Sequence, residues 1–437
     1  MPHEGRHAIV VGASLAGLAA AAALADRFDR VTVVERDTLP AGGPRPRTGV
    51  PQGRHGHILL PAGFQALSAL LPGITDDLLT AGAHLIDLGG IRFHIAGDHL
   101  AVDDTELQIV GATRPLLESA VRSRVRGLPN VEVVQEHDAR GLVVDGGVRV
   151  TGLRVCERDG GPEGILHGEL VVDAGGRGSR APRWLADVGH PVPDEERFHV
   201  GVNYTTRLFS RRPEDLDGCR HVVAAVPPHG RRGGFSVTVE DDRCLVTLVG
   251  VLGERPPTDL DGFVEYASTL ETDDLHVLVD GAEPVSQPST GAFPTYLRRH
   301  YERLPRLPDG FVVLGDAVCS FNPLYAQGMS MALREAALLG GVIDRHGTDG
   351  VGAAFLRQAT PMIDAAWAIA TSADLGHPEI LERRTVAWRL LNRWFGRLLR
   401  VAHHDPAVAN TYLRVISQVA PMQAILHPRI VWRVLTG

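Results

Sequence analysis

The stretch His7-Ala-Ile-Val-Val-Gly12-Ala-Ser-Leu-Ala-Gly17 begins as an apolar run and ends in a glycine turn. It predicts a β-strand from His7 to Val11, and the Ala/Leu-rich residues 18–26 predict a helix. Val31 to Val34 predict a second strand, which leads into Glu35. Strand, tight turn, helix and strand in this order are typical of a unit that binds a dinucleotide. A plain βαβ unit is the alternative, and the motif alone does not separate FAD from NAD.

The side chains of this turn suit a phosphate-binding role. Gly12 permits the sharp turn, and Gly17 lets the helix pack closely on the sheet. Ser14 replaces the second glycine of the GxGxxG pattern; it is small, and its hydroxyl could donate to a phosphate. The helix N-terminus would direct free N–H groups at a pyrophosphate. Glu35 stands where a carboxylate would accept hydrogen bonds from an adenosine ribose.

A second segment, far along the chain, predicts the other half of a cofactor site. Residues 311–314 predict a buried strand, Gly315 and Asp316 follow it, and Met331 to Leu339 predict a helix. Asp316 can accept hydrogen bonds from a ribityl hydroxyl. A helix start near Gly328 could direct N–H groups at the N1–C2=O edge of a flavin, which becomes negative on reduction. The alternative is a strand, loop and helix that only close the sheet.

Together these two segments resemble the flavoprotein monooxygenases of the para-hydroxybenzoate hydroxylase type. The resemblance is closer to bacterial secondary-metabolism enzymes of that fold, including epoxidases that act on polyene precursors of polyethers. Four stretches carry the closer resemblance: Gly49 to His57, Asp173 to Ser179, Tyr204 to Phe209 and Gly315 to Ser330. The final sixty or so residues carry less recognisable signal.

The resemblance implies FAD as the cofactor and places it against particular residues. Arg114, which opens the helix-like segment Arg114 to Val125, matches an arginine that approaches the cofactor's phosphate or ribose. Arg54 is expected to neutralise a cofactor phosphate. The expected cofactor-binding residues are Gly12, Ser14, Gly17, Glu35, Arg36, Arg54, Arg114, Asp316, Pro323, Gly328 and Met329.

Three departures from the family pattern affect these expectations. Ala326 replaces a usual glycine, and Ser330 stands where the hydroxylases have Asn. Both fit the epoxidase-like branch. Asp173-Ala174 replaces an Asp-Gly pair that in aromatic hydroxylases touches both FAD and NADPH. Direct reduction by NADPH or NADH is therefore an open expectation, and a separate flavin reductase is the alternative partner.

The predicted fold class is α/β. It has a Rossmann-like FAD-binding domain interleaved with an antiparallel β-sheet substrate domain, plus C-terminal helices. Period-2 alternation predicts the sheet within residues 198–300. The expected division is residues 1–197 for the first part of the FAD-binding domain, with a substrate-side insertion near 80–110, then 198–300 for the sheet, 301–349 for the second FAD-binding part and 350–437 for the helices.

A C-terminal helix is predicted from apolar residues at helical spacing between Ala387 and Val401, with four arginines between them. We expect it to pack on the sheet with a solvated basic flank. A membrane-surface contact or a docking face for a carrier protein is the alternative.

Composition excludes several classes of function. The net charge of −8 and the lack of long Lys/Arg blocks argue against a nucleic-acid partner. The apolar run Leu15 to Leu24 is too short to span a bilayer, so no transmembrane segment is expected. Four cysteines without CxxC spacing favour a reduced, cytoplasmic protein.

The His55-Gly-His57 pair has the spacing of some metal ligands but lacks an acidic or cysteine partner at useful spacing, so no metal is expected. Both histidines could lie near the flavin or the entrance. A structural role in capping the following helix is favoured over proton donation.

The expected reaction follows from the cofactor that the resemblance implies. Reduced FAD would react with O2 to form a C4a-hydroperoxide, which epoxidises or hydroxylates an apolar secondary-metabolite substrate. No catalytic acid or base is assigned. A halogenase is disfavoured because no tryptophan lies in a WxWxIP motif. A non-redox FAD-containing cyclase or binding scaffold and a flavin-dependent prenyl-chain reductase are the remaining alternatives.

Overall fold

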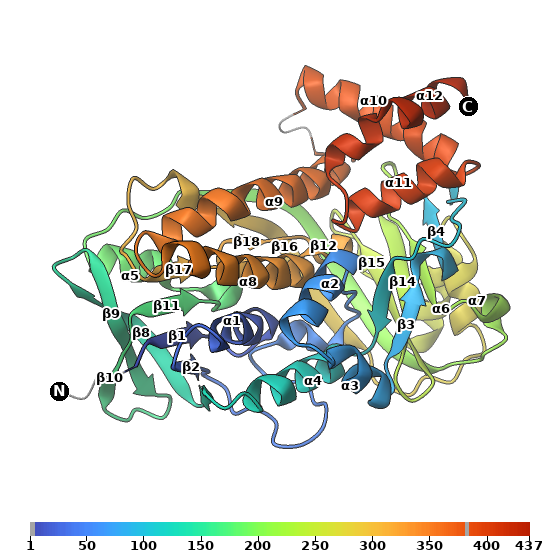
Figure 1. The fold of residues 1–437 in the computed structure, drawn as a ribbon. Helices are drawn as coiled ribbons and strands as arrows, with labels where there is room; N and C mark the ends of the chain where they lie inside the picture. The colour runs from blue at the N-terminus through green and yellow to red at the C-terminus, as the bar shows by residue number, and fades with distance from the viewer. Residues whose placement is uncertain (1–4, 381–383) are drawn as a thin grey trace.

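The computed structural model describes residues 5–380 and 384–437. A parallel sheet of five strands lies at its N-terminal side (Figure 1). The strand order is β17 (Phe311–Val313), β11 (Leu170–Asp173), β1 (His7–Val11), β2 (Arg30–Val34) and β7 (Val131–Val134). The sheet therefore joins strands from the two ends of the predicted cofactor-binding region, and the predicted α/β class is confirmed.

Helix α1 (Leu15–Ala25) is the centre of this half of the molecule. It packs against α8 (Gln327–His346) and α4 (Arg114–Arg126) as well as against β1. Every residue of α1 except Ala16 is buried. A helix that is apolar on all sides must be enclosed, and its run of alanines lets three neighbours approach it closely. The predicted helix over 331–339 is longer than expected, because it begins at Gln327 and continues to His346.

The second sheet has eight strands and covers the other half of the molecule (Figure 1). It is antiparallel except where β13 pairs with β4 in parallel. Its order is β18 (Cys319–Ser320), β16 (Ser289–Arg299), β12 (Glu195–Ser210), β15 (Arg243–Gly250), β14 (Arg232–Val239), β13 (His221–Ala224), β4 (Ile91–Ile95) and β5 (Asp98–His99). The hairpin between β14 and β15 turns through Glu240, Asp241 and Asp242, and both aspartates have positive φ.

Smaller elements complete the two halves. Strands β8 (His137–Asp145), β9 (Arg149–Glu157) and β10 (Glu163–His167) form an antiparallel sheet, and β3 (His84–Asp87) pairs with β6 (Gln108–Gly111). The remaining α-helices before the C-terminal group are α2 (Pro61–Leu70), α3 (Ile74–Thr80), α5 (Ala181–Asp187), α6 (Leu260–Ser268), α7 (Asp274–Val279) and α9 (Val351–Asp374).

Three further helices, α10 (Val386–Ala402), α11 (Pro406–Ile416) and α12 (Pro428–Thr436), lie beside the β4–β5 edge (Figure 1). The N–H of Ala101 donates to the carbonyl of Ala402 at 2.9 Å, and His403 Nε2 contacts the carbonyl of Ile95 at the same distance. The expected packing of α10 is correct only for its C-terminal half, where Leu398 is buried. Leu390 remains 61% exposed. Within the described residues, no helix combines the length and apolarity that crossing a bilayer requires.

Gly17 is expected to be essential for the packing of α1. A Cβ at this position would lie 1.8 Å from the carbonyl oxygen of Gly12, which is backbone and has no side chain to move away. We expect Gly17→Ala to lower the free energy of unfolding by about 3 kcal/mol in chemical denaturation. Gly42→Ala is the control, because a Cβ there meets nothing within 4 Å. Equal stability of the two variants would show that the close contact is not required.

Candidate cofactor and substrate cavity

A cavity of about 1170 Å³ is lined by both large sheets and by the C-terminal helices. We call one portion of its lining the polar part, which includes Gly12, Ser14, Glu35, Arg47, Arg114, Asp316 and Gly328. We call another portion the apolar part, which includes Ile91, Phe93, Ile95, Val223, Phe235, Trp388, Phe395 and Leu399. A site with these two parts suits a charged group and an apolar molecule in one space.

The turn after β1 brings backbone rather than side chains to the polar part. Gly12 has a φ of +97°, and a Cβ there would lie 2.8 Å from the carbonyl oxygen of Ala174. Ser14 is the N-cap of α1, yet its side chain makes no capping hydrogen bond. The hydroxyl donates instead to Glu118 Oε1 at 2.8 Å. The first N–H groups of α1 are therefore available to an anionic ligand.

Glu35 is held in place by the backbone around it. Its carboxylate accepts hydrogen bonds from the N–H of Ala13 at 2.8 Å and from the N–H of Asp37 at 3.0 Å. It is 4% exposed. This position after β2 is the one that the sequence predicts for a ribose-binding carboxylate.

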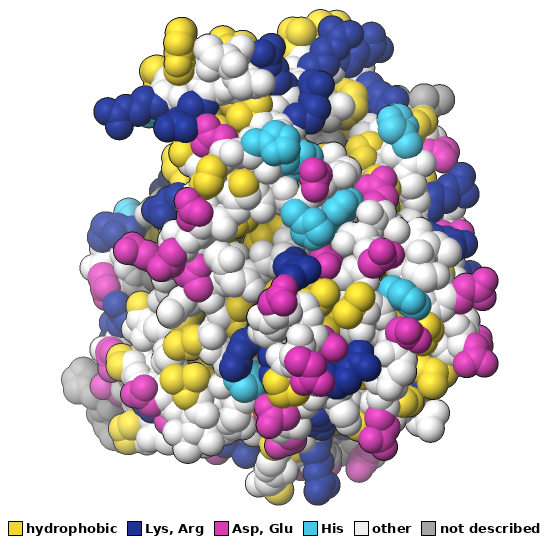
Figure 2. Space-filling model, turned by 90° about the vertical axis from the view of Figure 1, so that its right-hand side faces the viewer, with side chains coloured by type: hydrophobic (Ala, Val, Ile, Leu, Met, Phe, Trp, Pro, Cys, Tyr) yellow, Lys and Arg dark blue, Asp and Glu magenta, His cyan; other side chains and the backbone are white. Residues whose placement is uncertain are grey.

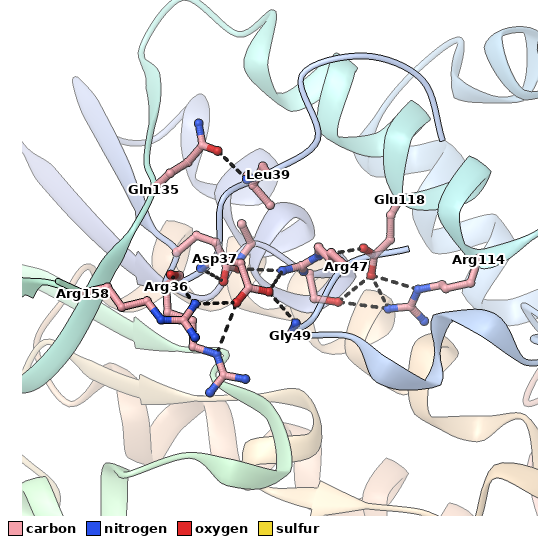
Figure 3. A network of polar contacts seen from close by, with 12 residues as sticks. Arg36, Asp37, Leu39, Arg47, Gly49, Arg114, Glu118, Gln135 and Arg158 are labelled. Atoms are coloured by element: carbon pink, nitrogen blue, oxygen red, sulfur yellow. Dashed lines mark hydrogen bonds and ion pairs between the residues drawn. The ribbon is translucent and has the colours of Figure 1, made fainter. Parts of the chain in front are cut away.

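A buried arginine that sequence reasoning did not single out joins these groups (Figure 3). Arg47 Nη1 lies 3.1 Å from Glu35 Oε2 and 3.6 Å from Asp37 Oδ2, and its Nε lies 3.2 Å from Glu118 Oε2. Its side chain is only 5% exposed. No local pattern identifies Arg47, because it lies in a loop with several other arginines and its partners come from two separate segments, the residues after β2 and helix α4.

Arg114, at the start of α4, approaches the same network. It contacts Glu118 Oε1 at 2.8 Å, one helical turn further on, and its Nη2 donates to the hydroxyl of Ser14 at 3.0 Å. Burial raises the pKa of Glu118, but Arg114 and Arg47 outweigh it and hold the pKa at about 2. Glu118 could have been found from the sequence, because an acid four residues after an arginine shares its helix face.

The other two predicted arginines lie differently. Arg36 lines the cavity, but its side chain is 61% exposed and its nearest carboxylate oxygen, on Asp37, is 3.9 Å away. Arg54 is exposed at the end of a short 3₁₀ turn and lies outside the cavity lining. Of the arginines near the polar part, Arg47 and Arg114 line the cavity and Arg54 does not.

The segment after β17 forms the second side of the polar part. Gly315 has a φ of +65°, and its N–H donates to the buried Glu335 at 2.5 Å. Asp316 lies deep in the cavity, where burial raises its pKa to about 6 although Arg114 and Arg177 lower it. The predicted residues Pro323, Gly328 and Met329 also line the cavity.

Helix α8 begins beside Asp316 without a side-chain cap. Its N-cap is Ala326, which has a φ of +52°. This left-handed conformation favours glycine. Glycine is also the residue that the family pattern has at the position of Ala326. A Cβ on Gly328 would lie 3.4 Å from Asp316 Oδ1. The side-chain oxygen of Gln327 is buried and has no hydrogen-bond partner among the described residues. The start of α8 thus offers free donors and one free acceptor to a ligand.

A buried carboxylate on α9 anchors this turn, and sequence reasoning missed it. Asp374 accepts a hydrogen bond from the hydroxyl of Tyr325 at 2.7 Å, one from the amide of Asn322 at 3.3 Å and one from the hydroxyl of Tyr296. Burial raises the pKa of Asp374 to about 6. The interaction joins α9 to the turn before α8 and to β16, and no spacing in the sequence indicates it.

His55 and His57 line the cavity but carry no charge near neutral pH. His55 packs edge-on against Tyr204 with ring centroids 4.5 Å apart, and its Nδ1 contacts the hydroxyl of Thr206 at 3.0 Å. Burial lowers the pKa of His55 to about 4 and that of His57 to about 3. The expected capping role is wrong, because the next helix, α2, has Leu60 as its N-cap and no side-chain capping bond.

Asp173 precedes Ala174, where the sequence departs from the family pattern. Its side chain points towards the loop that follows it, residues 175–179. It accepts hydrogen bonds from the N–H of Gly175 at 2.8 Å and from the hydroxyl of Ser179. Burial raises its pKa.

The residues of the polar part fit FAD. Two helices, α1 and α8, begin at the cavity without side-chain caps, so their N–H groups and positive dipole ends can receive a pyrophosphate and an electron-rich ring edge. Glu35 can receive a ribose. The free oxygen of Gln327 can accept from a ring N–H. A Cβ at Gly12 would lie 2.8 Å from the carbonyl oxygen of Ala174, so the turn admits no larger residue there.

Comparison with known proteins identifies the family. No family model matches the chain. The chain is 33% identical to Protein Rv3254 of Mycobacterium tuberculosis over 442 residues, which cover 98% of this chain and 93% of that protein. It is 26% identical to 6-methylpretetramide 4-monooxygenase of Streptomyces rimosus, with coverage of 77% and 75%.

Among solved structures, pqsL of Pseudomonas aeruginosa, described as "a probable FAD-dependent monooxygenase", superposes with a TM-score of 0.63 at 19% identity. The match covers 85% of this chain and 98% of that one. The chain therefore belongs to the same family as Protein Rv3254, and it shares its fold with FAD-binding monooxygenases of the para-hydroxybenzoate hydroxylase type.

The depressed pKa of Glu118 predicts a pH dependence. Its ordinary pKa of 4.5 falls to about 2 in the folded protein, so its contribution to stability is complete above 4.5 and is lost as the pH falls towards 2. We expect Glu118→Gln to be less stable than the wild type at pH 6. The difference should shrink by about 1 kcal/mol on going to pH 3.5.

Denaturant titrations at both pH values measure this difference. Glu132→Gln is the control, because Glu132 is an exposed carboxylate whose only partner, within the described part of the chain, is the equally exposed Arg30. A difference for Glu118→Gln that stays constant or grows towards acid would contradict the assigned interaction.

Proposed function

We propose that this protein transfers one atom of O2 to an apolar organic substrate, as an epoxide or a hydroxyl group. The observation that carries the proposal is the joining of the polar and apolar parts in one cavity. The polar part fits FAD, and the apolar part is formed by aliphatic and aromatic side chains of β4, β13, β14 and α10. An apolar substrate held there would lie in the same enclosed space as the flavin ring.

Reduced FAD, when bound, supplies the activation of O2 that amino-acid side chains cannot provide. The protein's own groups bind and orient. Glu35, Arg114 and the start of α1 would hold the adenosine and pyrophosphate, and Asp316 with the start of α8 would hold the ribityl chain and the ring edge. The neutral His55 and His57 place no strong base or fixed charge in the cavity wall. Such a wall excludes water and protects reactive intermediates from side reactions.

The substrate class follows from the chemistry of the apolar part. Phe93, Phe235 and Phe395 offer ring faces, and Ile91, Ile95 and Leu399 offer aliphatic surface. These groups bind by burial of apolar area and make no directional polar contact. An alkene or electron-rich arene of the secondary-metabolite kind fits better than a charged metabolite. This preference agrees with the resemblance to polyene epoxidases.

Oxygen labelling tests the proposal. The holoenzyme, reduced with NADPH, NADH or a separate flavin reductase, is given a panel of polyenes and phenols under ¹⁸O₂. We expect a product that carries one ¹⁸O atom, and no label when only the water is enriched. Turnover that is unchanged without O2 would contradict the proposal. In that event, turnover with oxidised flavin would indicate a non-redox cyclase, and saturation of an alkene would indicate a reductase. Comparison of the reductants shows whether the chain accepts electrons from nicotinamide directly.

A bulky residue in the apolar part should impair substrate binding and spare the cofactor. Val223 on β13 lines the cavity, so Val223→Trp should raise KM for an accepted apolar substrate by at least about tenfold. FAD affinity, measured by fluorescence quenching, should stay unchanged. Val148→Trp is the control, because Val148 lies at an exposed turn and is 59% exposed. An unchanged KM in Val223→Trp would place the substrate elsewhere.

A further inference from the structure

The C-terminal helices expose large apolar side chains next to arginines. Leu390 on α10 is 61% exposed, and on α12 Trp432 is 69% and Leu435 54% exposed. Leu426, just before α12, is also exposed. Exposed apolar side chains that lie together mark an interaction surface more often than scattered single residues do. Figure 2 shows yellow apolar and dark-blue basic side chains side by side at the top of the molecule, where these helices lie. We call this surface the C-terminal face.

The two helices present one surface rather than two separate ones. The guanidinium of Arg397 on α10 donates to the carbonyls of Val434 and Leu435 at the end of α12, both at 2.7 Å. This contact holds the middle of α10 against the C-terminal turn of α12. Leu390 and Leu435 therefore belong to neighbouring parts of the same face.

The charge of this region is opposite to that of the protein. The whole chain carries −8, yet residues 384–437 contain one acidic side chain, Asp405. They contain eight arginines: Arg384, Arg389, Arg393, Arg397, Arg400, Arg414, Arg429 and Arg433. Asp405 is engaged by Arg433 at 2.7 Å. Arg389, Arg393 and Arg429 are exposed and form no ion pair with any carboxylate in the described ranges. The C-terminal face thus attracts anions while the rest of the protein repels them.

The inner side of α10 belongs to the cavity. Trp388, Phe395 and Leu399 line it, and so does Leu391, which is still 37% exposed to solvent. A residue that is both cavity lining and surface marks the rim of the opening. One helix therefore has an outer side on the C-terminal face and an inner side in the apolar part of the cavity.

We propose that the C-terminal face docks on an anionic lipid bilayer. Helices that expose Trp and Leu next to arginines can lie in the plane of such an interface, with the apolar side chains inserted between headgroups and the arginines on the phosphates. Tryptophan is preferred at this depth. An acidic protein partner would pair its carboxylates with the arginines. It would also place Trp432 and Leu435 against charged groups, which do not favour burial of apolar side chains. Docking sets the rim of the cavity against the phase in which apolar molecules concentrate.

Vesicle binding tests the proposal independently of any oxygenation chemistry. The FAD-loaded full chain is sedimented with vesicles of phosphatidylcholine alone or with one-third phosphatidylglycerol. We expect binding to the anionic vesicles only, weakened by high salt. Arg389→Gln with Arg393→Gln, and separately Leu390→Ser with Trp432→Ser, should each lower the partition coefficient by about tenfold or more. Matched controls are Arg183→Gln and Ile165→Ser, which change exposed residues outside this face. Both controls should bind like the wild type.

Insertion depth gives a second readout. Lipids with brominated acyl chains should quench the tryptophan fluorescence of the wild type. The Trp432→Phe variant should lose most of this quenching, and its melting temperature should equal that of the wild type. The proposal is overturned if the wild type ignores anionic vesicles, or if both double variants bind as the wild type does. It is also overturned if light scattering shows a dimer that Leu390→Arg converts to a monomer, because a second copy then covers the face.

Discussion

The close approach of α1 to the turn after β1 is the constraint on which the rest of this structure depends. Gly17 faces the carbonyl of Gly12 at a distance that leaves no room for a Cβ. Because α1 lies so near, the turn at Gly315 can pack on it as well: a Cβ at Gly315 would be 3.2 Å from that of Ala16. The starts of α1 and α8, from opposite ends of the cofactor-binding region, are thereby fixed around one cavity. The absence of a side chain at Gly17 and at Gly315 thus sets the geometry of the N-termini of α1 and α8.

Around this backbone frame the polar part is built from buried charges. Glu35, Asp37 and Glu118 share Arg47, and Arg114 completes the set. Buried ion pairs of this kind add little net stability, because desolvation offsets most of their attraction, but the loss of one member is costly. Their value here is positional. They hold Ser14 and Glu35 in fixed orientations, so that binding of the cofactor requires little rearrangement. Among the residues that the structure describes, the apolar part has no comparable network, and shape and burial alone would select its ligand.

Local signals in the sequence predicted the fold class and much of the polar part. Gly12, Glu35 and Asp316 stand at strand ends where backbone geometry fixes their place, so a short pattern suffices to find them. Arg47 and Asp374 could not be found this way, because their partners lie on segments joined only by tertiary packing. The histidines show the converse error: both precede a helix, yet His55 contacts Thr206 and Tyr204 of the eight-stranded sheet, and His57 contacts the carbonyl of His55. The apolar stripe of α10 was recognised, but its periodicity does not reveal which half finds a partner.

If the cofactor and the apolar substrate share one cavity, a crystal structure of the FAD-loaded protein with a bound apolar ligand will show both within it. We expect the adenosine beside Glu35, the flavin ring at the start of α8, and the ligand among Phe93, Phe235 and Phe395. A ligand bound outside the cavity, or a flavin ring directed away from these side chains, would contradict this expectation.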